Sequence, residues 1–189
     1  MKKIGLTVAL ASIMACGSGV TVPEETAAEP KPKEAHLPTG LLERPFTADE
    51  IRGEWSEGLE IRIRNWSTEG EVFEIWNVVE TDDDGCDIQS VTLDRDGNPA
   101  GEPALHRSGW VELRDHASFP ADRATRQRAS RTTGLGDLEG WLYTVPDPAS
   151  GRVSEFFFAD SLPGAPVFVH VTLNGELVQV FEQVERTRR

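Results

Sequence analysis

No group of side chains in this chain of 189 residues has the residue types and spacing of a catalytic or metal-binding motif. Three histidines, His106, His116 and His170, lie in the part expected to fold, and no two have the spacing of metal ligands on one helix face. The residue types of a hydrolytic triad occur in His106, Ser108 and Asp115, but nothing in the sequence brings them together, and no G-x-S-x-G elbow is present. We therefore expect a protein that is not an enzyme, with no catalytic residue, metal or cofactor.

Two acidic turns have some features of a calcium-binding loop. With Gly85 at the sixth position of an EF-hand loop, acidic residues fall at the first three ligand positions, but Val91 stands where the bidentate glutamate is needed. In the second turn, residues 94–99, Pro99 occupies the position that requires glycine. Asp, Asn and Gly are also the residues that hairpin turns favour, so we interpret both clusters as turns.

Cys16 carries the most specific chemical prediction. It directly follows an apolar, uncharged run, residues 4–15, which is preceded by a pair of lysines. This order is typical of a secretory signal. The run is shorter than the about 20 residues that span a bilayer. Ile13, Ala15 and Cys16 resemble the lipobox of bacterial lipoproteins. The resemblance implies that residues 1–15 are a signal peptide and that Cys16 is diacylated and becomes the mature N-terminus.

The acylated cysteine implies a cellular location as well as a membrane anchor. Several acyl chains give lasting membrane attachment, because each buried methylene contributes about 0.8 kcal/mol. The residue directly after Cys16 is not aspartate, which resembles the default outer-membrane signal of proteobacterial lipoproteins. We expect a protein of the bacterial cell envelope, attached to the outer membrane through Cys16.

Composition divides the rest of the chain in two. Residues 16–45 hold five prolines among polar residues and show no hydrophobic period, which predicts a disordered tether after the lipidated cysteine. Residues 46–189 are expected to form a single β-rich domain. The formal charge of −13 becomes −15 without the two signal-peptide lysines, and argues against a nucleic-acid partner. With Cys16 acylated, Cys86 has no partner for an intrachain disulfide.

The domain is expected to be mainly β, a curled, half-barrel-like antiparallel meander of about eight or nine strands with two short helices. One helix is expected over residues 46–52, where Thr47 and Glu50 have the spacing of a capping box. The other is expected over 108–119, with Ser108 as its cap. Strands are expected at 59–64, 71–80, 88–93, 123–133, 141–145, 153–159, 167–173 and 177–186.

Turn residues set the expected hairpins. The Asp84-Gly85 pair predicts a turn because this pair tolerates positive φ, and Asn174-Gly175 is the strongest hairpin signal in the chain. Both faces of the strand over 71–80 are apolar, which predicts a strand that is central in the sheet or covered on both sides.

The C-terminal half resembles a known envelope fold. Residues 134–143 and 157–167, which include a Leu-Pro-Gly corner at 162–164, look like a pattern seen in uncharacterised bacterial lipoproteins. Their sheet is similar to the half-barrel of the lipoprotein-carrier, LolA/LolB-like proteins. The resemblance covers residues 123–186 and implies a concave apolar surface able to hold acyl chains. It assigns no individual binding residue.

Two functions follow as hypotheses. In the first, a non-enzymatic lipoprotein binds an apolar ligand or lipidated partner in a cavity lined by Trp76, Trp141, Phe157 and Val169. In the second, these residues fill a solid core, and the protein is a structural or protein-interaction module of the outer membrane. A continuous cavity favours the first hypothesis and a filled core favours the second.

A basic stripe, Arg123 to Arg131, stands out on an acidic chain. We expect its arginines to pair across strands with Glu69, Glu71 or Glu74. A surface that receives an acidic partner or headgroup is the alternative.

Overall fold

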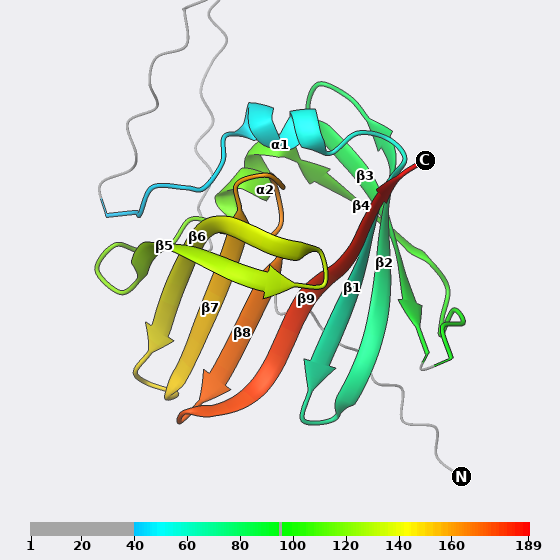
Figure 1. Ribbon diagram of the computed structural model, residues 1–189. Coiled ribbons are helices and arrows are strands. Elements are labelled where there is room, and N and C mark those ends of the chain that lie inside the picture. Colours follow the sequence, from blue (N-terminus) through cyan, green and yellow to red (C-terminus); the bar gives the residue numbers. More distant parts are fainter. Residues whose placement is uncertain (1–39, 95) are drawn as a thin grey trace, which may run out of the picture. The chain divides into compact units, whose positions relative to one another are not determined.

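The computed structural model describes residues 40–94 and 96–189 (Figure 1). The predicted signal peptide, Cys16 and the tether as far as residue 39 lie outside the described residues. Within the described ranges, no helix has the length and hydrophobicity to cross a membrane.

Nine antiparallel strands form one open sheet in the order β4-β3-β2-β1-β9-β8-β7-β6-β5. Two short helices accompany it, so the predicted fold class is confirmed. The elements are α1 (Ala48–Glu54), β1 (Leu59–Ser67), β2 (Gly70–Thr81), β3 (Gly85–Leu93), β4 (Ala104–Gly109), α2 (Trp110–Asp115), β5 (Thr125–Thr133), β6 (Gly136–Asp147), β7 (Arg152–Ala159), β8 (Phe168–Leu173) and β9 (Glu176–Arg188).

The sheet consists of two meanders. The first runs from β1 at the centre to β4 at one edge, and the second runs from β5 at the other edge back to β9 at the centre, where β9 pairs antiparallel with β1. The chain passes from one edge to the other through α2. Tight turns predict the neighbours within each meander, whereas the central β1–β9 pairing joins distant parts of the sequence.

The sequence did not indicate β4. Its first four residues, Ala104 to Arg107, are exposed, so no apolar alternation marks this edge strand. Ser108 belongs to β4 and is buried, so its predicted role as the α2 cap is wrong. The N-cap is Gly109, whose N–H donates to the Glu112 carboxylate at 3.3 Å.

The capping box of α1 is confirmed. The Thr47 N–H donates to the Glu50 carboxylate at 2.7 Å, and the Glu50 N–H donates to the Thr47 hydroxyl at 3.2 Å. The folded part starts before this helix, because Leu42 N–H donates to the carbonyl of Phe119 at 2.9 Å and Leu41 bridges to Pro120. The contacts of the folded part thus extend at least to Leu41, ahead of the predicted start at residue 46.

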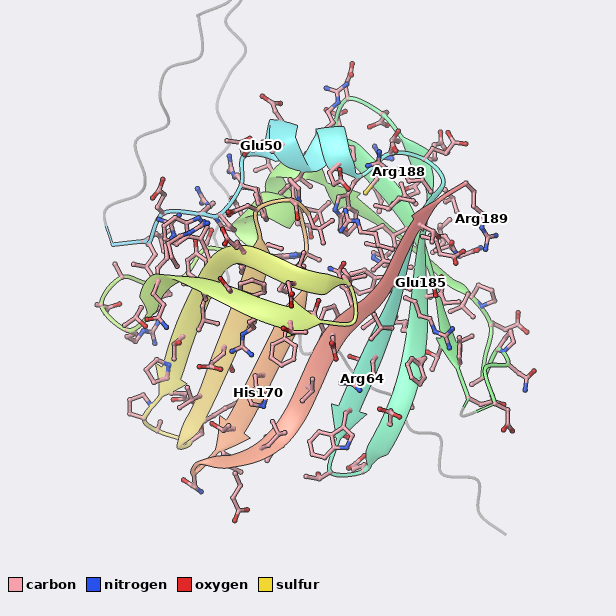
Figure 2. The ribbon with its side chains drawn as sticks, in the orientation of Figure 1. Glu50, Arg64, His170, Glu185, Arg188 and Arg189 are labelled. Atoms are coloured by element: carbon pink, nitrogen blue, oxygen red, sulfur yellow. The ribbon has the colours of Figure 1, made fainter. Side chains whose placement is uncertain are left out.

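Side chains alternate between two faces of the sheet, and each face has its own core. We call the face that packs against α1 and α2 the inner face; its cluster includes Trp55, Ile61, Trp110, Tyr143 and Phe158. The opposite, outer face carries a smaller cluster, formed by Leu142, Phe157, Ala159 and Val167. Figure 2 looks onto the outer face, where Arg64 and His170 are labelled.

β6 approaches β7 closely at Gly140. A Cβ atom at this position would lie 1.9 Å from the carbonyl oxygen of Phe158, so only glycine allows this approach. The tip of the β5–β6 hairpin then crosses over β7 and β8 to β9 (Figure 1). There Gly134 N–H donates to the Glu182 carboxylate at 2.9 Å. Leu135 and Leu138 of the hairpin cover the outer cluster.

The two predicted turns differ in conformation. Asn174 and Gly175 both have positive φ, 52° and 87°, as the hairpin signal predicts. Gly85 is not among the positive-φ residues, so the predicted reason for this glycine is wrong. A Cβ atom there would lie 2.3 Å from the Ser108 carbonyl oxygen, so the close approach of β4 requires glycine.

Candidate functional site

A continuous row of apolar side chains crosses the inner face beside its core. Trp76 of β2 lies against Phe181 of β9, with 6.1 Å between ring centroids. Phe181 pairs with Val169 of β8, and Val169 pairs with Phe156 of β7. We call these four residues the aromatic row. Each of them is partly exposed.

The aromatic row is partly exposed because the helices cover only one end of the inner face. Figure 1 shows α1 and α2 at the end of the sheet where β1 begins. The buried part of the inner cluster, from Ile51 and Trp55 to Leu59 and Ile61, lies at that end. The Phe156 end of the row continues into this core, since its ring lies 5.0 Å from Phe119.

The four residues predicted to line a cavity do not share one. Trp76 and Val169 lie in the aromatic row. Trp141 faces the same side, but the guanidinium carbon of Arg126 stacks 3.4 Å from the centre of its ring. Phe157 is fully buried in the outer cluster, against which Leu135 and Leu138 of the β5–β6 hairpin pack. Phe156 and Phe181 take its place in the row.

The basic stripe is paired with carboxylates, as expected, but the expected partners are wrong. Arg126 pairs with Glu43, Arg128 with Asp160 at 2.7 Å, and Arg131 with Glu155 at 3.2 Å. Arg123 lies 3.9 Å from Asp122. The guanidinium groups also stack on aromatic rings, such as Arg131 over Phe168 at 4.7 Å. The contacts of Arg126, Arg128 and Arg131 attach β5 to neighbouring segments.

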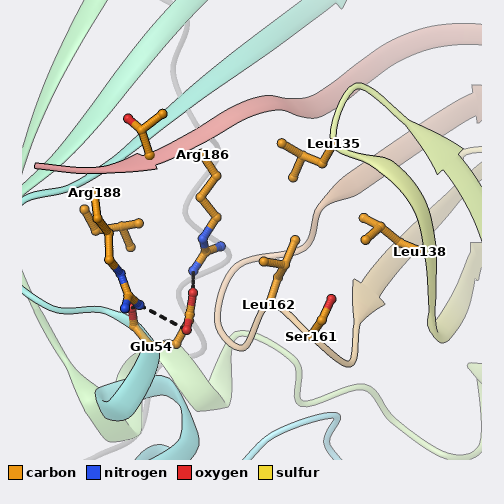
Figure 3. Close-up of a pocket in the computed structure, with 9 residues that line it drawn as sticks. Glu54, Leu135, Leu138, Ser161, Leu162, Arg186 and Arg188 are labelled. Atoms are coloured by element: carbon orange, nitrogen blue, oxygen red, sulfur yellow. Dashed lines mark hydrogen bonds and ion pairs between the residues drawn. The ribbon is translucent and has the colours of Figure 1, made fainter.

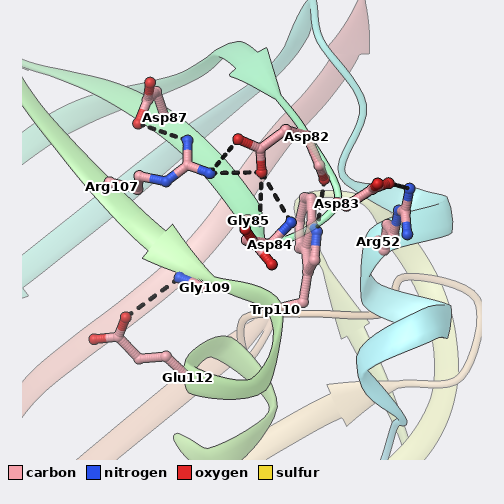
Figure 4. Close-up of polar contacts among 10 residues, drawn as sticks. All are labelled: Arg52, Asp82, Asp83, Asp84, Gly85, Asp87, Arg107, Gly109, Trp110 and Glu112. Carbon is pink, nitrogen blue, oxygen red and sulfur yellow. Dashed lines mark hydrogen bonds and ion pairs between the residues drawn. The ribbon is translucent and has the colours of Figure 1, made fainter. Parts of the chain in front are cut away.

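The acidic turn after β2 is a structural junction (Figure 4). The Asp82 carboxylate accepts from the N–H groups of Asp84 and Gly85 at 2.9 and 3.0 Å and from Arg107. The hydrogen bond from Arg107 lowers the pKa of Asp82 below its usual value, with the two backbone donors adding to the effect. Trp110 Nε1 donates to the Asp82 carbonyl at 3.0 Å, which attaches α2 to the turn. Over residues 40–94 and 96–189, no three His, Cys, Asp or Glu side chains are grouped to hold a metal ion.

The three residues whose types match a hydrolytic triad, His106, Ser108 and Asp115, lie in different surroundings. Asp115 accepts from Arg114 at 2.8 Å and pairs with Arg44 at 3.1 Å. Ser108 is buried between β3 and α2, while His106 is exposed on β4. Cys86 is fully buried in the inner cluster, and burial raises the pKa of its thiol to about 11. A thiol of this kind stays protonated and unreactive at neutral pH.

Comparison with known proteins shows the fold alone. No family model matches the chain, and no curated protein matches its sequence. One similar structure is a Bacteroides fragilis protein described as an exported protein with a YmcC-like fold, at 11% identity and a TM-score of 0.46, covering 70% of this chain and 97% of that one. Another is the Pseudomonas aeruginosa MucA/MucB complex, at 11% identity and a TM-score of 0.50, covering 74% of this chain. The match spans only 56% of that second chain.

Proposed function

We propose that this protein is a non-enzymatic lipoprotein of the cell envelope that binds an apolar ligand, or the acyl chain of a lipidated partner, along the aromatic row. The observation that carries the proposal is the row from β7 through β8 to β9, extended over β1 by the contact of Phe181 with Trp76 of β2, on a face that the helices leave partly open. Trp76, Phe156 and Phe181 pack against the inner core but keep part of their surface in contact with solvent, and contiguous exposed apolar surface can mark a binding surface. Aromatic side chains supply much of the contact area in such sites.

The location rests on the sequence before the folded part. The lipobox-like residues that end at Cys16 support export, acylation and attachment to the outer membrane. The acidic composition suits a domain held in solution above a membrane surface.

The anchor predicts a simple fractionation result. Replacing Cys16 by serine should move the protein from the membrane fraction to the soluble fraction of the envelope, because the acylated thiol is lost. The matched control is Cys86→Ser, which leaves the proposed anchor intact and should stay with the membrane. If Cys16→Ser remains in the membrane fraction, the lipoprotein assignment is incorrect.

A ligand that occupies the row should accompany the protein on purification. We expect organic extracts of protein taken from its native host, after its own acyl groups are accounted for, to contain an apolar molecule at a stoichiometric level. Mass spectrometry of the extract identifies it. An extract without such a molecule would argue for the second candidate below.

The second candidate is a protein-interaction module of the outer membrane without a ligand site. The edge strand β4 favours it, because Leu105 on this strand is 64% exposed. An open strand edge with exposed apolar residues can accept a strand from a partner.

A further inference from the structure

The β5 edge of the sheet is open along its nine residues, Thr125–Thr133. Among residues 40–94 and 96–189, β5 pairs only with β6, and no main-chain hydrogen bond joins it to another segment. In an antiparallel pair only every second residue exchanges hydrogen bonds with its partner strand, so the other residues of β5 direct their N–H and C=O groups toward the free edge. A strand edge of this kind is a template for a further strand.

This edge lacks most of the features that protect sheet edges. β5 contains no proline, and its register against β6 has no bulge. The opposite edge strand, β4, has only six residues and passes directly into α2, so it is a shorter template.

Positive charge is the feature that guards β5. The strand holds Arg126, Arg128 and Arg131 and no acidic residue, on a chain whose net charge is −13. The acidic residues of the hairpin, Asp137 and Glu139, lie on β6, away from the free edge. Like charges on neighbouring strands are destabilising, so the arginines disfavour pairing with a second copy of β5 and favour an acidic strand.

The hairpin that carries this edge is held in place on its other sides. At its tip, Gly134 N–H donates to the Glu182 carboxylate at 2.9 Å. On the β6 side, Leu138 and Leu162 line a groove of about 340 Å³ together with Arg186 (Figure 3). An edge that is already ordered loses little conformational freedom on binding, which favours affinity.

A row of outer-face side chains lies next to the free edge. The hairpin covers Phe168 of β8, since the guanidinium carbon of Arg131 lies 4.7 Å from the centre of its ring. Two residues farther along β8, His170 pairs with Val180 of β9, which pairs with Trp66 of β1. Figure 2 shows His170 on the part of the outer face that the hairpin leaves uncovered. A strand added to β5 lies about 4.8 Å from it and therefore over this row.

The charges at the edge can accept a carboxylate. The side chain of Arg128 is 48% exposed and pairs with Asp160, which is 46% exposed. Ion pairs with this exposure are weak, so a carboxylate of a partner can take the place of Asp160. Next to the edge, the Glu155 carboxylate is shared by Arg131 at 3.2 Å and His170 at 3.7 Å. Because Glu155 is paired in this way, it opposes an acidic strand only weakly.

We propose that an extended, acidic segment of a partner protein adds to the sheet as a strand along the free edge of β5. Its main chain pairs with β5, its carboxylates interact with Arg128, and its alternate apolar side chains lie against Val180 and Trp66. In such complexes main-chain hydrogen bonds give affinity, and alternate side chains give specificity. The proposal does not depend on the aromatic row, which lies on the inner face.

Fluorescence anisotropy with a labelled, capped peptide as long as β5, in which glutamate and valine alternate, tests the proposal. The full chain carrying Cys16→Ser is used, so that acyl chains of the protein itself do not capture the peptide. We expect one peptide per chain. It should bind at least tenfold more tightly than the same peptide methylated at every main-chain nitrogen, which keeps the side chains and charge but has no N–H to donate. Equal affinity for the two peptides, or no binding of the first, would overturn the proposal.

Two charge reversals locate the peptide. Arg128→Glu should reduce its affinity at least tenfold, and the Tm is measured alongside. The matched control is Arg52→Glu on α1, because Arg52 is also 48% exposed and also pairs with an aspartate, Asp83. This control changes the net charge equally and should leave the affinity within about twofold of the parent, because exposed charges at a distance are largely screened. Equal affinity in the two variants would contradict the proposal.

A third variant separates the two edges of the sheet. Leu105→Glu places a negative charge on β4 and should leave peptide binding unchanged. If Leu105→Glu removes binding while Arg128→Glu preserves it, the peptide adds to β4. The β5 proposal would then fail while the second candidate function stands.

Discussion

Replacing Trp55 by alanine should lower the free energy of unfolding by about 3–5 kcal/mol. Trp55 is the C-cap residue of α1 and only 1% exposed. Its Nε1 donates to the carbonyl of Pro163 at 2.9 Å, which ties the helix to the loop between β7 and β8. The indole also packs directly against Gly164. Alanine would leave a large cavity and an unpaired carbonyl at the junction of helix and sheet.

Urea denaturation followed by far-UV circular dichroism measures this loss. Val111→Ala is a matched truncation on α2, where the side chain is 55% exposed, and should change stability by no more than about 0.5 kcal/mol. Trp55→Phe should fall between the two, because it restores most of the volume but not the hydrogen bond. A Trp55→Ala protein as stable as Val111→Ala would show that α1 is not held in this way.

Replacing Gly140 by alanine should destabilise the protein by about 3 kcal/mol, at the upper end of the overpacking range. The new Cβ atom would overlap the backbone oxygen of Phe158, which cannot move aside as a side chain can. Either β6 separates from β7 at this point or the hairpin tip leaves the outer face. In both cases Phe157 and its neighbours lose their cover.

Hydrogen exchange distinguishes a local effect from general unfolding. We expect Gly140→Ala to lose amide protection first in β5 and in the first half of β6, while the central β1 and β9 amides remain protected. Gly53→Ala is the matched control, because its Cβ would meet nothing within 4 Å and its φ is not positive. Alanine in place of this helical glycine should stabilise α1 by up to about 1 kcal/mol. Amide protection in Gly140→Ala equal to that of the parent protein would mean that the backbone at this position tolerates a side chain.

Local features of this fold are readable from the sequence because their causes are local. The Thr47–Glu50 capping box needs a spacing of three residues, and the Asn174-Gly175 turn needs two residues that accept positive φ. Both are present as predicted. The basic stripe shows the limit of such reasoning. Its pairing with carboxylates can be predicted, but the partners Glu43 and Asp160 cannot, because they come from distant parts of the chain.

The sheet faces are harder to predict than the strands. In the run Phe156-Phe157-Phe158, a period of two leaves open which rings face the helices. Phe157 is the same residue type as both of its neighbours, yet it lies on the outer face, where the β5–β6 hairpin covers its cluster. The grouping of Glu54, Leu138 and Arg186 around one groove is harder still to predict from the sequence, because these residues come together only after β9 has paired with β1.

The central claim is that the aromatic row binds an apolar ligand, and the affinity of the full chain for N-phenyl-1-naphthylamine tests it most directly. Fluorescence titrations compare the parent protein with Phe181→Ser, in the row, and Leu177→Ser, on the same strand but outside it; all three carry Cys16→Ser. We predict at least a tenfold loss of affinity in Phe181→Ser and none in Leu177→Ser. Equal affinity in all three proteins, or no binding by the parent, would contradict the claim.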